Sequence, residues 1–253
     1  IPMIGDSDDA LMVRFFPEKL GVYRSLLATG AVIFERWDFK YKAGSFDDKS
    51  LWLLGVKGKS VFDALPEHDS QAKPLRSEFE EGGYWVFGSN LGTAREIRIV
   101  ADAGPLGYLS IAAHGHADAL SLMLSVAGSE IFVDPGTYAY HTQQKWRDYF
   151  RGTSAHNTVR VDGRDQSESG GNFLWLKHAE ARRLSFESRP EKDVWEAEHK
   201  GYRRLGDPVT HRRMVEFDKA RAVLTIVDTL ECEQSHEIDI NWHLSEQCEV
   251  NLD

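Results

Sequence analysis

The chain has 253 residues, of which 42% are hydrophobic and 11% aromatic, and its formal net charge is −10. This composition excludes a disordered protein and supplies enough apolar residues for a sizeable core. The acidic balance argues against nucleic-acid binding, which needs a basic face. No apolar run approaches the roughly 20 residues that cross a bilayer, so we expect no membrane span.

The first part of the sequence is predicted to be helical. Apolar residues recur at helical spacing between residues 10 and 37, with an interruption at Pro17, and a shorter helical pattern covers residues 48–54. A polar, proline-containing stretch then indicates a domain boundary. We therefore expect a helical segment at residues 1–65 and a second domain at residues 66–253.

The second domain is predicted to be mainly β. Short apolar runs alternate with turn residues, and a tight reversal is expected at residues 128–129. The expected strands are residues 84–87, 95–100, 108–113, 120–126, 131–133, 158–161, 222–227 and 236–244. Many short strands at this spacing predict a large antiparallel β-sandwich that follows the short helical segment.

The two ends of the sequence suggest a piece of a longer protein. The chain begins at Ile1 without an initiator Met, and residues 248–253 look like a strand that is cut short. The lack of a targeting segment therefore carries no information about location. The two cysteines, Cys232 and Cys248, are compatible with free thiols or with a disulfide.

The stretch from His114 to Asp118 carries the clearest chemistry. If the preceding residues form a strand, the side chains of His114, His116 and Asp118 point to one side, because strand side chains alternate. Asp134 ends another expected strand, and His156 precedes a third. Two histidines and a carboxylate match a common zinc arrangement, and Asp118 is a candidate second carboxylate that fixes an imidazole tautomer. Hydrogen-bonded residues without a metal are an equally open interpretation of these spacings.

Four blocks in this order resemble the heparinase II/III family of polysaccharide lyases. They are His-Gly-His-Ala-Asp at 114–118, Phe-Val-Asp-Pro-Gly-Thr-Tyr at 132–138, Tyr-Phe-Arg at 149–151 and Ser-Ala-His-Asn-Thr-Val at 154–159. The resemblance runs from about residue 84 to the end. Residues 5–8 and the following helices are similar to the close of that family's α/α-toroid domain.

The resemblance implies a function and a set of site residues. His114 matches a histidine in the family's active-site cleft, and His116, Asp134 and His156 match ligands of a mainly structural zinc ion. The implied reaction is β-elimination on a uronic-acid-containing, anionic polysaccharide, in a periplasmic or secreted enzyme. The family's toroid supplies the catalytic Tyr and a neutralising Asn or His, and most of that domain is not in this sequence. The chain is therefore expected to supply the metal-bearing side of the cleft.

Two further residues are predicted to contact substrate. Arg151 lies beside the block that contains His156, and an arginine can hold a carboxylate or sulfate through two parallel hydrogen bonds. Tyr138 is the second candidate, although its alternation with Tyr140 is equally compatible with packing on a strand. Arg147 is a weaker candidate of the same kind.

Three other functions remain open from the sequence. A cupin-like metal enzyme also carries His-x-His on a strand, but it normally has a glutamate shortly afterwards, where this sequence has Asp118 and then apolar residues. A glycan-binding or polysaccharide-biosynthesis-associated module could keep the metal only for stability. A hydrolase that activates metal-bound water would be recognised by saturated products.

Overall fold

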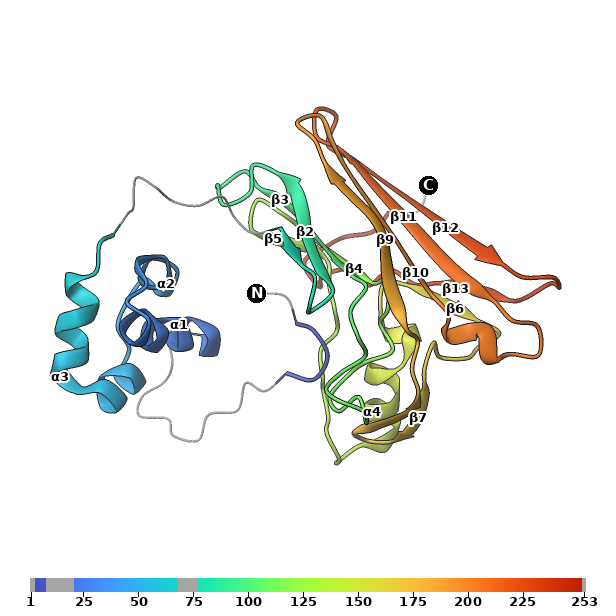
Figure 1. Cartoon of the computed structure of the whole chain (residues 1–253), viewed down its shortest axis with the longest axis horizontal. Coiled ribbons are helices and arrows are strands. Elements are labelled where there is room, and N and C mark those ends of the chain that lie inside the picture. The colour runs from blue at the N-terminus through green and yellow to red at the C-terminus, as the bar shows by residue number, and fades with distance from the viewer. Residues whose placement is uncertain (1–2, 8–20, 68–76, 252–253) are drawn as a thin grey trace. The chain divides into compact units, whose positions relative to one another are not determined.

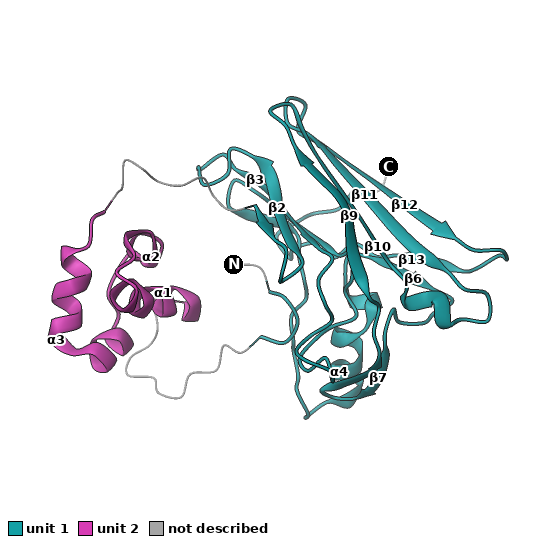
Figure 2. Ribbon diagram, viewed as in Figure 1, with its two compact units in different colours: residues 1–7, 75–253 teal, residues 8–74 magenta. Residues whose placement is uncertain are grey.

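A computed structural model describes residues 3–7, 21–67 and 77–251 of the chain. The chain divides into two compact units, Ile1–Ser7 with Leu75–Asp253, and Asp8–Pro74 (Figure 2). This division differs from the expected one at residue 65, because the first seven residues group with the β domain and not with the helices. Both cysteines are free.

The described part of the helical unit contains three helices around a small core. They are α1 (Val22–Ile33), α2 (Trp37–Ala43) and α3 (Asp48–Ala64). The buried residues of its hydrophobic core are Ala28, Ala31, Ala43 and Phe62. The helix expected at 48–54 continues to the end of α3, across a kink at Gly55, where φ is 65°. Of the helix expected from residue 10, residues 10–20 lie outside the described residues.

Two antiparallel sheets form the body of the β unit (Figure 1). The first has the order β1–β2–β3–β4–β5, with bounds Glu78–Phe79, Tyr84–Ser89, Ile97–Asp102, Leu122–Val126 and Ser129–Phe132. The second has the order β12–β11–β10–β9, with bounds Val223–Glu231, Thr210–Asp218, Lys192–His199 and Ala181–Ser188.

Smaller elements connect these sheets. They are α4 (Gln144–Arg151), the 3₁₀ turns η1 (Thr153–Ala155) and η2 (Gly201–Arg204), and the strand pairs β6 (Val159–Val161) with β13 (Ile238–Ile240) and β7 (Glu168–Gly171) with β8 (Leu174–Lys177). Within the described residues, none of the helices combines the length and apolar character that crossing a bilayer requires.

The two large sheets bury one continuous core between them. Trp85 of β2 packs against Trp195 of β10, with ring centroids 6.2 Å apart, and Phe87 packs against Phe186 at 5.7 Å. The cluster also contains Ile99, Leu120, Leu122, Val215 and Phe217. Each such side chain contributes about 1.5–3 kcal/mol when it is fully buried. The predicted mainly-β, antiparallel sandwich is therefore confirmed.

The hairpin between β4 and β5 shows how local sequence positions the site. Val126 pairs with Ser129, so the turn consists of Ala127 and Gly128, which have φ values of 50° and 84°. Two positive φ values define the type I′ turn that suits the twist of a two-residue hairpin. The predicted reversal therefore forms, one residue earlier than expected. Asp134 follows the end of β5, so the hairpin sets the position of this candidate ligand.

Two predicted strands are wrong. Residues 108–113 form a tight loop in which only Tyr108 and Ala113 pair as an isolated bridge. Positive φ values at Leu109, Ala112 and His114 (55°, 51° and 62°) are incompatible with an extended strand. Residues 248–251 also form no strand.

Three strands of the second sheet were not predicted. The inward side chains of β10 and β11 include Asp193, His199, His211 and Arg213, all of which are buried, whereas β9 has no fully buried residue. These polar residues occupy core positions, so the alternation of apolar and polar residues that signals a strand is missing from the sequence.

Candidate metal centre and adjoining cavity

Three predicted site residues from separate segments come together in the β unit. His116 lies in the loop before β4, Asp134 follows β5, and His156 follows η1. One potential ligand atom from each lies within 4.8 Å of the other two. Both imidazole side chains are fully buried, and the Asp134 side chain is 5% exposed. The structure thus gathers the residues that the sequence predicts as metal ligands.

Local hydrogen bonds fix Asp134 and His156. Asp134 Oδ1 accepts from Gly136 N at 2.9 Å, and its Oδ2 lies 2.8 Å from His156 Nδ1. Gly136 has a φ of 71°, which a residue with a side chain rarely adopts. The neighbouring Asn157 side chain donates to Leu122 O and Val133 O, at 2.8 and 3.0 Å. The His156 segment is therefore tied to both strands of the β4–β5 hairpin.

Charge and burial oppose each other at this pair. Burial acts to raise the pKa of Asp134, but the charge and hydrogen bond of His156 outweigh it, so this pKa is lowered. Burial acts to lower the pKa of His156, and the Asp134 carboxylate outweighs that effect, so this pKa is raised. The pair therefore favours an ionised carboxylate beside a protonated imidazole, and binding of a cation would release the imidazole proton.

Each imidazole keeps one nitrogen without a partner. Among the described residues, His116 Nδ1 and His156 Nε2 are buried and make no hydrogen bond. An unsatisfied buried polar atom costs about 1–3 kcal/mol, so two in neighbouring rings need a physical reason. The ring centroids are 5.3 Å apart. Two imidazoles and a carboxylate form a donor set that fits a divalent transition-metal ion such as zinc.

Asp6 connects the metal candidates to His114, and sequence reasoning missed it. Asp6 Oδ1 lies 3.0 Å from His116 Nε2, and Oδ2 lies 3.1 Å from His114 Nδ1. The Arg147 guanidinium donates to both oxygens of the same carboxylate. Burial acts to raise the pKa of Asp6, but the hydrogen bonds of His116 and Arg147 hold it well below its usual range. Asp6, and not Asp118, is the carboxylate that contacts the His116 ring.

Residues 3–7 reach this position through backbone contacts. Asp6 N donates to His114 O at 2.9 Å, and Ser7 N donates to Thr137 Oγ1 at 2.7 Å. Gly5 has a φ of 59°, and a Cβ there would lie 2.7 Å from His114 O. A glycine is therefore required for this close approach. No local pattern in the sequence links Asp6 to a histidine 110 positions away.

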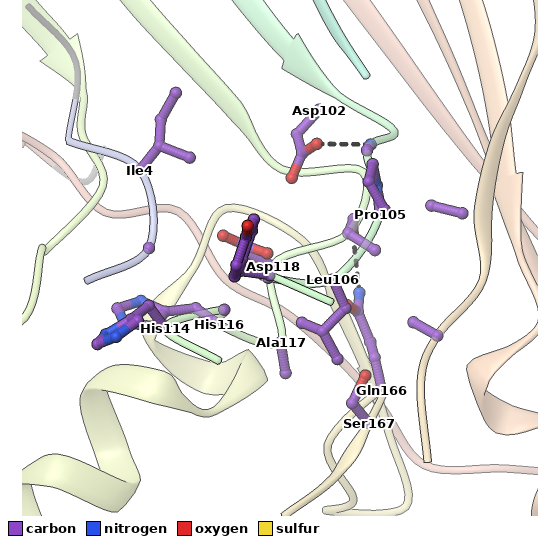
Figure 3. A pocket seen from close by; sticks show the side chains of 18 of the residues that line it. Ile4, Asp102, Pro105, Leu106, His114, His116, Ala117, Asp118, Gln166 and Ser167 are labelled. Atoms are coloured by element: carbon purple, nitrogen blue, oxygen red, sulfur yellow. Dashed lines mark hydrogen bonds between the residues drawn. The ribbon is translucent and has the colours of Figure 1, made fainter. Parts of the chain in front are cut away.

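A cavity of about 330 Å³ adjoins the metal candidates. His114, His116, Asp118 and Asp102 line it (Figure 3). Tyr84 is a further lining residue. Burial, and next the charge of Asp118, raise the pKa of Asp102. Burial also raises the pKa of Asp118, although the charges of His156 and His116 act in the opposite direction. Burial and these carboxylates also raise the pKa of Tyr84. Burial therefore opposes ionisation of the carboxyl groups in the cavity wall.

Two further polar atoms line the same cavity. Gln166 Oε1 and Ser167 Oγ are buried without a hydrogen-bond partner. Gln166 itself is held by bonds from its Nε2 to Ala119 O, at 2.9 Å, and to Thr158 Oγ1, at 3.2 Å. Among the described residues, these two buried atoms beside the cavity are left for an ordered water or another polar group to satisfy.

His114 is the accessible histidine of the group. Its side chain is 57% exposed, in contrast to the buried His116. The ring lies 5.8 Å from that of Phe173 and 6.3 Å from that of Tyr140, which hold it at the edge of the cavity. An imidazole with a carboxylate partner and an open face can transfer protons to and from a bound substrate.

The two predicted substrate-contact residues differ in accessibility. Tyr138 is 62% exposed and stacks on Phe150, with ring centroids 5.1 Å apart. Arg151 is only 2% exposed. Its guanidinium donates to Gly171 O and lies 4.5 Å from the centre of the Trp175 ring. Burial, and next the charge of Arg147, lower the pKa of Arg151 to about 10. A contact between Arg151 and substrate would require the side chain to leave these partners.

The β-sandwich belongs to a known protein family. The model of the "Heparinase II/III-like, C-terminal" family matches residues 71–253, and the chain belongs to this family. A search of curated proteins finds no match.

Solved structures show the same fold. The chain is similar to heparan sulfate lyase HepC from Pedobacter heparinus, with 21% identity, a TM-score of 0.63 and coverage of 97% of this chain and 32% of that one. A structure described as heparinase III gives 18% identity and a TM-score of 0.62, with the same two coverages. The chain thus spans about a third of the length of these structures.

Proposed function

We propose that this chain supplies the metal-bearing β-sandwich side of the cleft in a polysaccharide lyase that cleaves uronic-acid-containing glycans by β-elimination. One observation carries the proposal. The accessible His114 and the buried His116 bond to the same carboxylate, Asp6, at the edge of one polar cavity. Membership of the heparinase II/III-like family and the names of the similar solved structures support the substrate class.

The reaction needs three chemical tasks. The enzyme must neutralise the uronate carboxylate, remove the proton from the adjacent carbon, and protonate the glycosidic oxygen that leaves. His114 is proposed to act as a catalytic residue, either as a partner of the carboxylate or as an acid–base group. Asp102 and Asp118, whose pKa values are raised by burial, line the same cavity as His114.

The metal would have a structural role in this proposal. His116, Asp134 and His156 would hold a zinc ion, which supplies a fixed positive charge to this side of the cleft. Asp6 would orient His116 and, through its second oxygen, His114. This shared carboxylate couples the position of the accessible histidine to that of the buried ligand.

The proposal also covers substrate contact and location. The exposed Tyr138 is a candidate to stack on a sugar ring, whereas Arg151 would contribute only after a rearrangement of its buried guanidinium. An anionic polysaccharide as substrate is consistent with a periplasmic or secreted protein.

The decisive experiment measures the products. This chain, and any longer protein that contains it, is incubated with sulfated and unsulfated uronic-acid glycans, and unsaturated ends are detected by their ultraviolet absorbance. His114→Ala should lower the rate by about 10²–10⁴, the usual effect of losing an acid–base group. His141→Ala, at an exposed histidine, is the matched control and should retain the rate.

The alternatives give different products. Saturated ends would indicate hydrolysis, and glycan binding without new ends would indicate a binding module. Full turnover in His114→Ala would show that His114 is not catalytic.

A further inference from the structure

A second group of metal-binding side chains lies outside the cavity. It consists of Asp207, which precedes β11, Cys232, which follows β12, and His236, which precedes β13. One potential ligand atom from each lies within 4.8 Å of the other two. None of these residues belongs to the candidate site described above, and none was singled out by the sequence.

Two carboxylates hold the loop that carries this group. Asp207 Oδ2 accepts from Glu233 N at 3.1 Å and from Gln234 N at 2.9 Å. Asp162 Oδ1 accepts from Glu237 N at 2.9 Å. The loop between β12 and β13 is therefore anchored on both sides of His236, and its first residue, Cys232, is kept next to Asp207.

The imidazole of His236 lies between the same two carboxylates. Its Nδ1 is 2.7 Å from Asp162 Oδ2, and its Nε2 is 2.9 Å from Asp207 Oδ2. The His236 and Asp207 side chains are only 7% and 8% exposed, while Cys232 is exposed to solvent. A contact from Nδ1 to a carboxylate is the usual way in which proteins orient a histidine that binds a metal through Nε2.

The donor set selects a class of cation. A thiolate, an imidazole and a carboxylate are ligands of zinc-type ions, whereas calcium and magnesium require oxygen ligands. Bond lengths of about 2.0–2.3 Å around a tetrahedral ion place ligand atoms roughly 3–4 Å apart, so small side-chain movements close the site. Three protein ligands leave a fourth position for water.

We propose that Asp207, Cys232 and His236 form a second, zinc-type metal site, with Asp162 as the carboxylate that orients His236. Binding replaces the proton on His236 Nε2 and the thiol proton of Cys232 with the cation. The bound ion joins the β12–β13 loop to the segment before β11, and Asp162 extends this link to the end of β6. The site does not depend on the proposed lyase activity.

The alternative is a metal-free ion pair. A protonated His236 between Asp162 and Asp207 would also fasten the loop, and its hydrogen bonds to these aspartates raise the pKa of His236. The two interpretations differ in the role of Cys232, because the ion pair does not use the thiol. Substitution of this exposed cysteine therefore separates them without disturbing the core.

The test is cobalt(II) titration of the metal-depleted full chain, kept reduced by a reagent without thiols. Cobalt bound to a thiolate gives a charge-transfer band in the near ultraviolet, and the other candidate site contains no cysteine. The wild-type chain and the His116→Ala variant should both show this band, and added zinc should abolish it. Cys232→Ser should lose the band, whereas the control Cys248→Ser should retain it.

A second variant tests the orienting carboxylate. Asp162→Asn should weaken cobalt binding by about 10–100-fold, the usual effect of losing such a partner. Absence of a charge-transfer band at saturating cobalt would overturn the proposal, as would a band that survives in Cys232→Ser. Circular dichroism of each variant confirms that the fold is retained.

Discussion

Two buried polar clusters in the β unit contrast in how completely their atoms are paired. The first is the cluster of Asp6, His116, Asp134 and His156, which keeps two imidazole nitrogens without a partner. The second, here called the sheet network, consists of His199, His211, Arg213 and Asp228 on β10, β11 and β12.

Every side chain of the sheet network is paired. His199 accepts from Gly201 N at 3.2 Å and contacts His211, whose Nε2 lies 2.7 Å from Asp228 Oδ1. Arg213 donates to both oxygens of Asp228, at 2.7 and 2.9 Å. Burial acts to raise the pKa of Asp228, but the bonds from His211 and Arg213 hold it well below its usual range.

The two clusters therefore differ in role: the sheet network stabilises the fold, and the histidine–carboxylate cluster keeps atoms that a ligand can bind. A network whose donors and acceptors are all satisfied contributes to folding and offers nothing to a ligand. A cluster with unpaired buried nitrogens beside a polar cavity carries a cost that a bound ion would remove. Arg213 also joins the two clusters, since it donates to Leu120 O at 2.8 Å and to Asn157 O at 2.6 Å, next to His156.

The largest expected effect on stability comes from breaking the sheet network. Arg213→Met should lower the free energy of unfolding by about 3–5 kcal/mol, because it removes one partner of a buried ion pair. Urea denaturation measures this loss. The control is Arg212→Ala, whose partially exposed pair with Glu196 should change stability by less than about 1 kcal/mol. Equal effects of the two substitutions would contradict the structural role of the network.

The next largest effect on stability is expected from a metal ion bound at the unpaired nitrogens of His116 and His156. In a Cys232→Ser background, which removes the second site, His116→Ala should abolish zinc binding as measured by elemental analysis. With free zinc about 100-fold above its dissociation constant, bound metal adds about 2.7 kcal/mol of stability. A chelator should therefore destabilise the parent chain and leave the His116→Ala variant unchanged. A metal-free parent chain, equally stable with and without chelator, would refute the metal centre.

A smaller effect is expected for the carboxylate that orients His116. Asp6→Asn keeps the size of the side chain but removes its charge, and zinc affinity should fall by about 10–100-fold. Competition with a chromogenic chelator measures this change, and Asp63→Asn, at an exposed carboxylate paired with Lys59, is the control. Unchanged affinity would mean that Asp6 serves only to neutralise Arg147.

The smallest effect concerns pH. Burial, and next the charges of His211 and Arg213, lower the pKa of His199 well below 6.5. The unfolded chain then binds a proton that the folded chain does not, so this contribution to stability is present above pH ~6.5 and is lost as pH falls, by at most about 1.4 kcal/mol per pH unit. His199→Asn should therefore show a shallower loss of melting temperature below pH ~6.5 than the wild type. Parallel profiles would show that His199 does not titrate with unfolding.

Local motifs predicted part of this molecule correctly. The four sequence blocks named His116, Asp134 and His156 as one group, and the structure brings these three side chains together, while their role as metal ligands stays a prediction. The type I′ hairpin at Ala127–Gly128 forms close to where the sequence predicted it, since its backbone conformation is set by two residues.

Prediction failed where a residue depends on distant partners. The strand expected at 108–113 is a loop, yet His114 and His116 still meet, because both bond to Asp6 and not because they alternate along a strand. Strands β10 and β11 were missed because several of their core positions hold charged and polar side chains, which are buried only after the sheet pairs them.

The sequence by itself determined the antiparallel β-sandwich, because strand propensity and turn chemistry act over a few residues. The family resemblance named His116, Asp134 and His156 as metal ligands, and their binding of a metal stays a prediction. Only the tertiary structure decided that Asp6 is the carboxylate of His116, that Arg151 is buried, and that Asp207, Cys232 and His236 meet. The physical reason is that hydrogen bonds, burial and charge pairing join residues far apart in the chain, and no local pattern encodes those contacts.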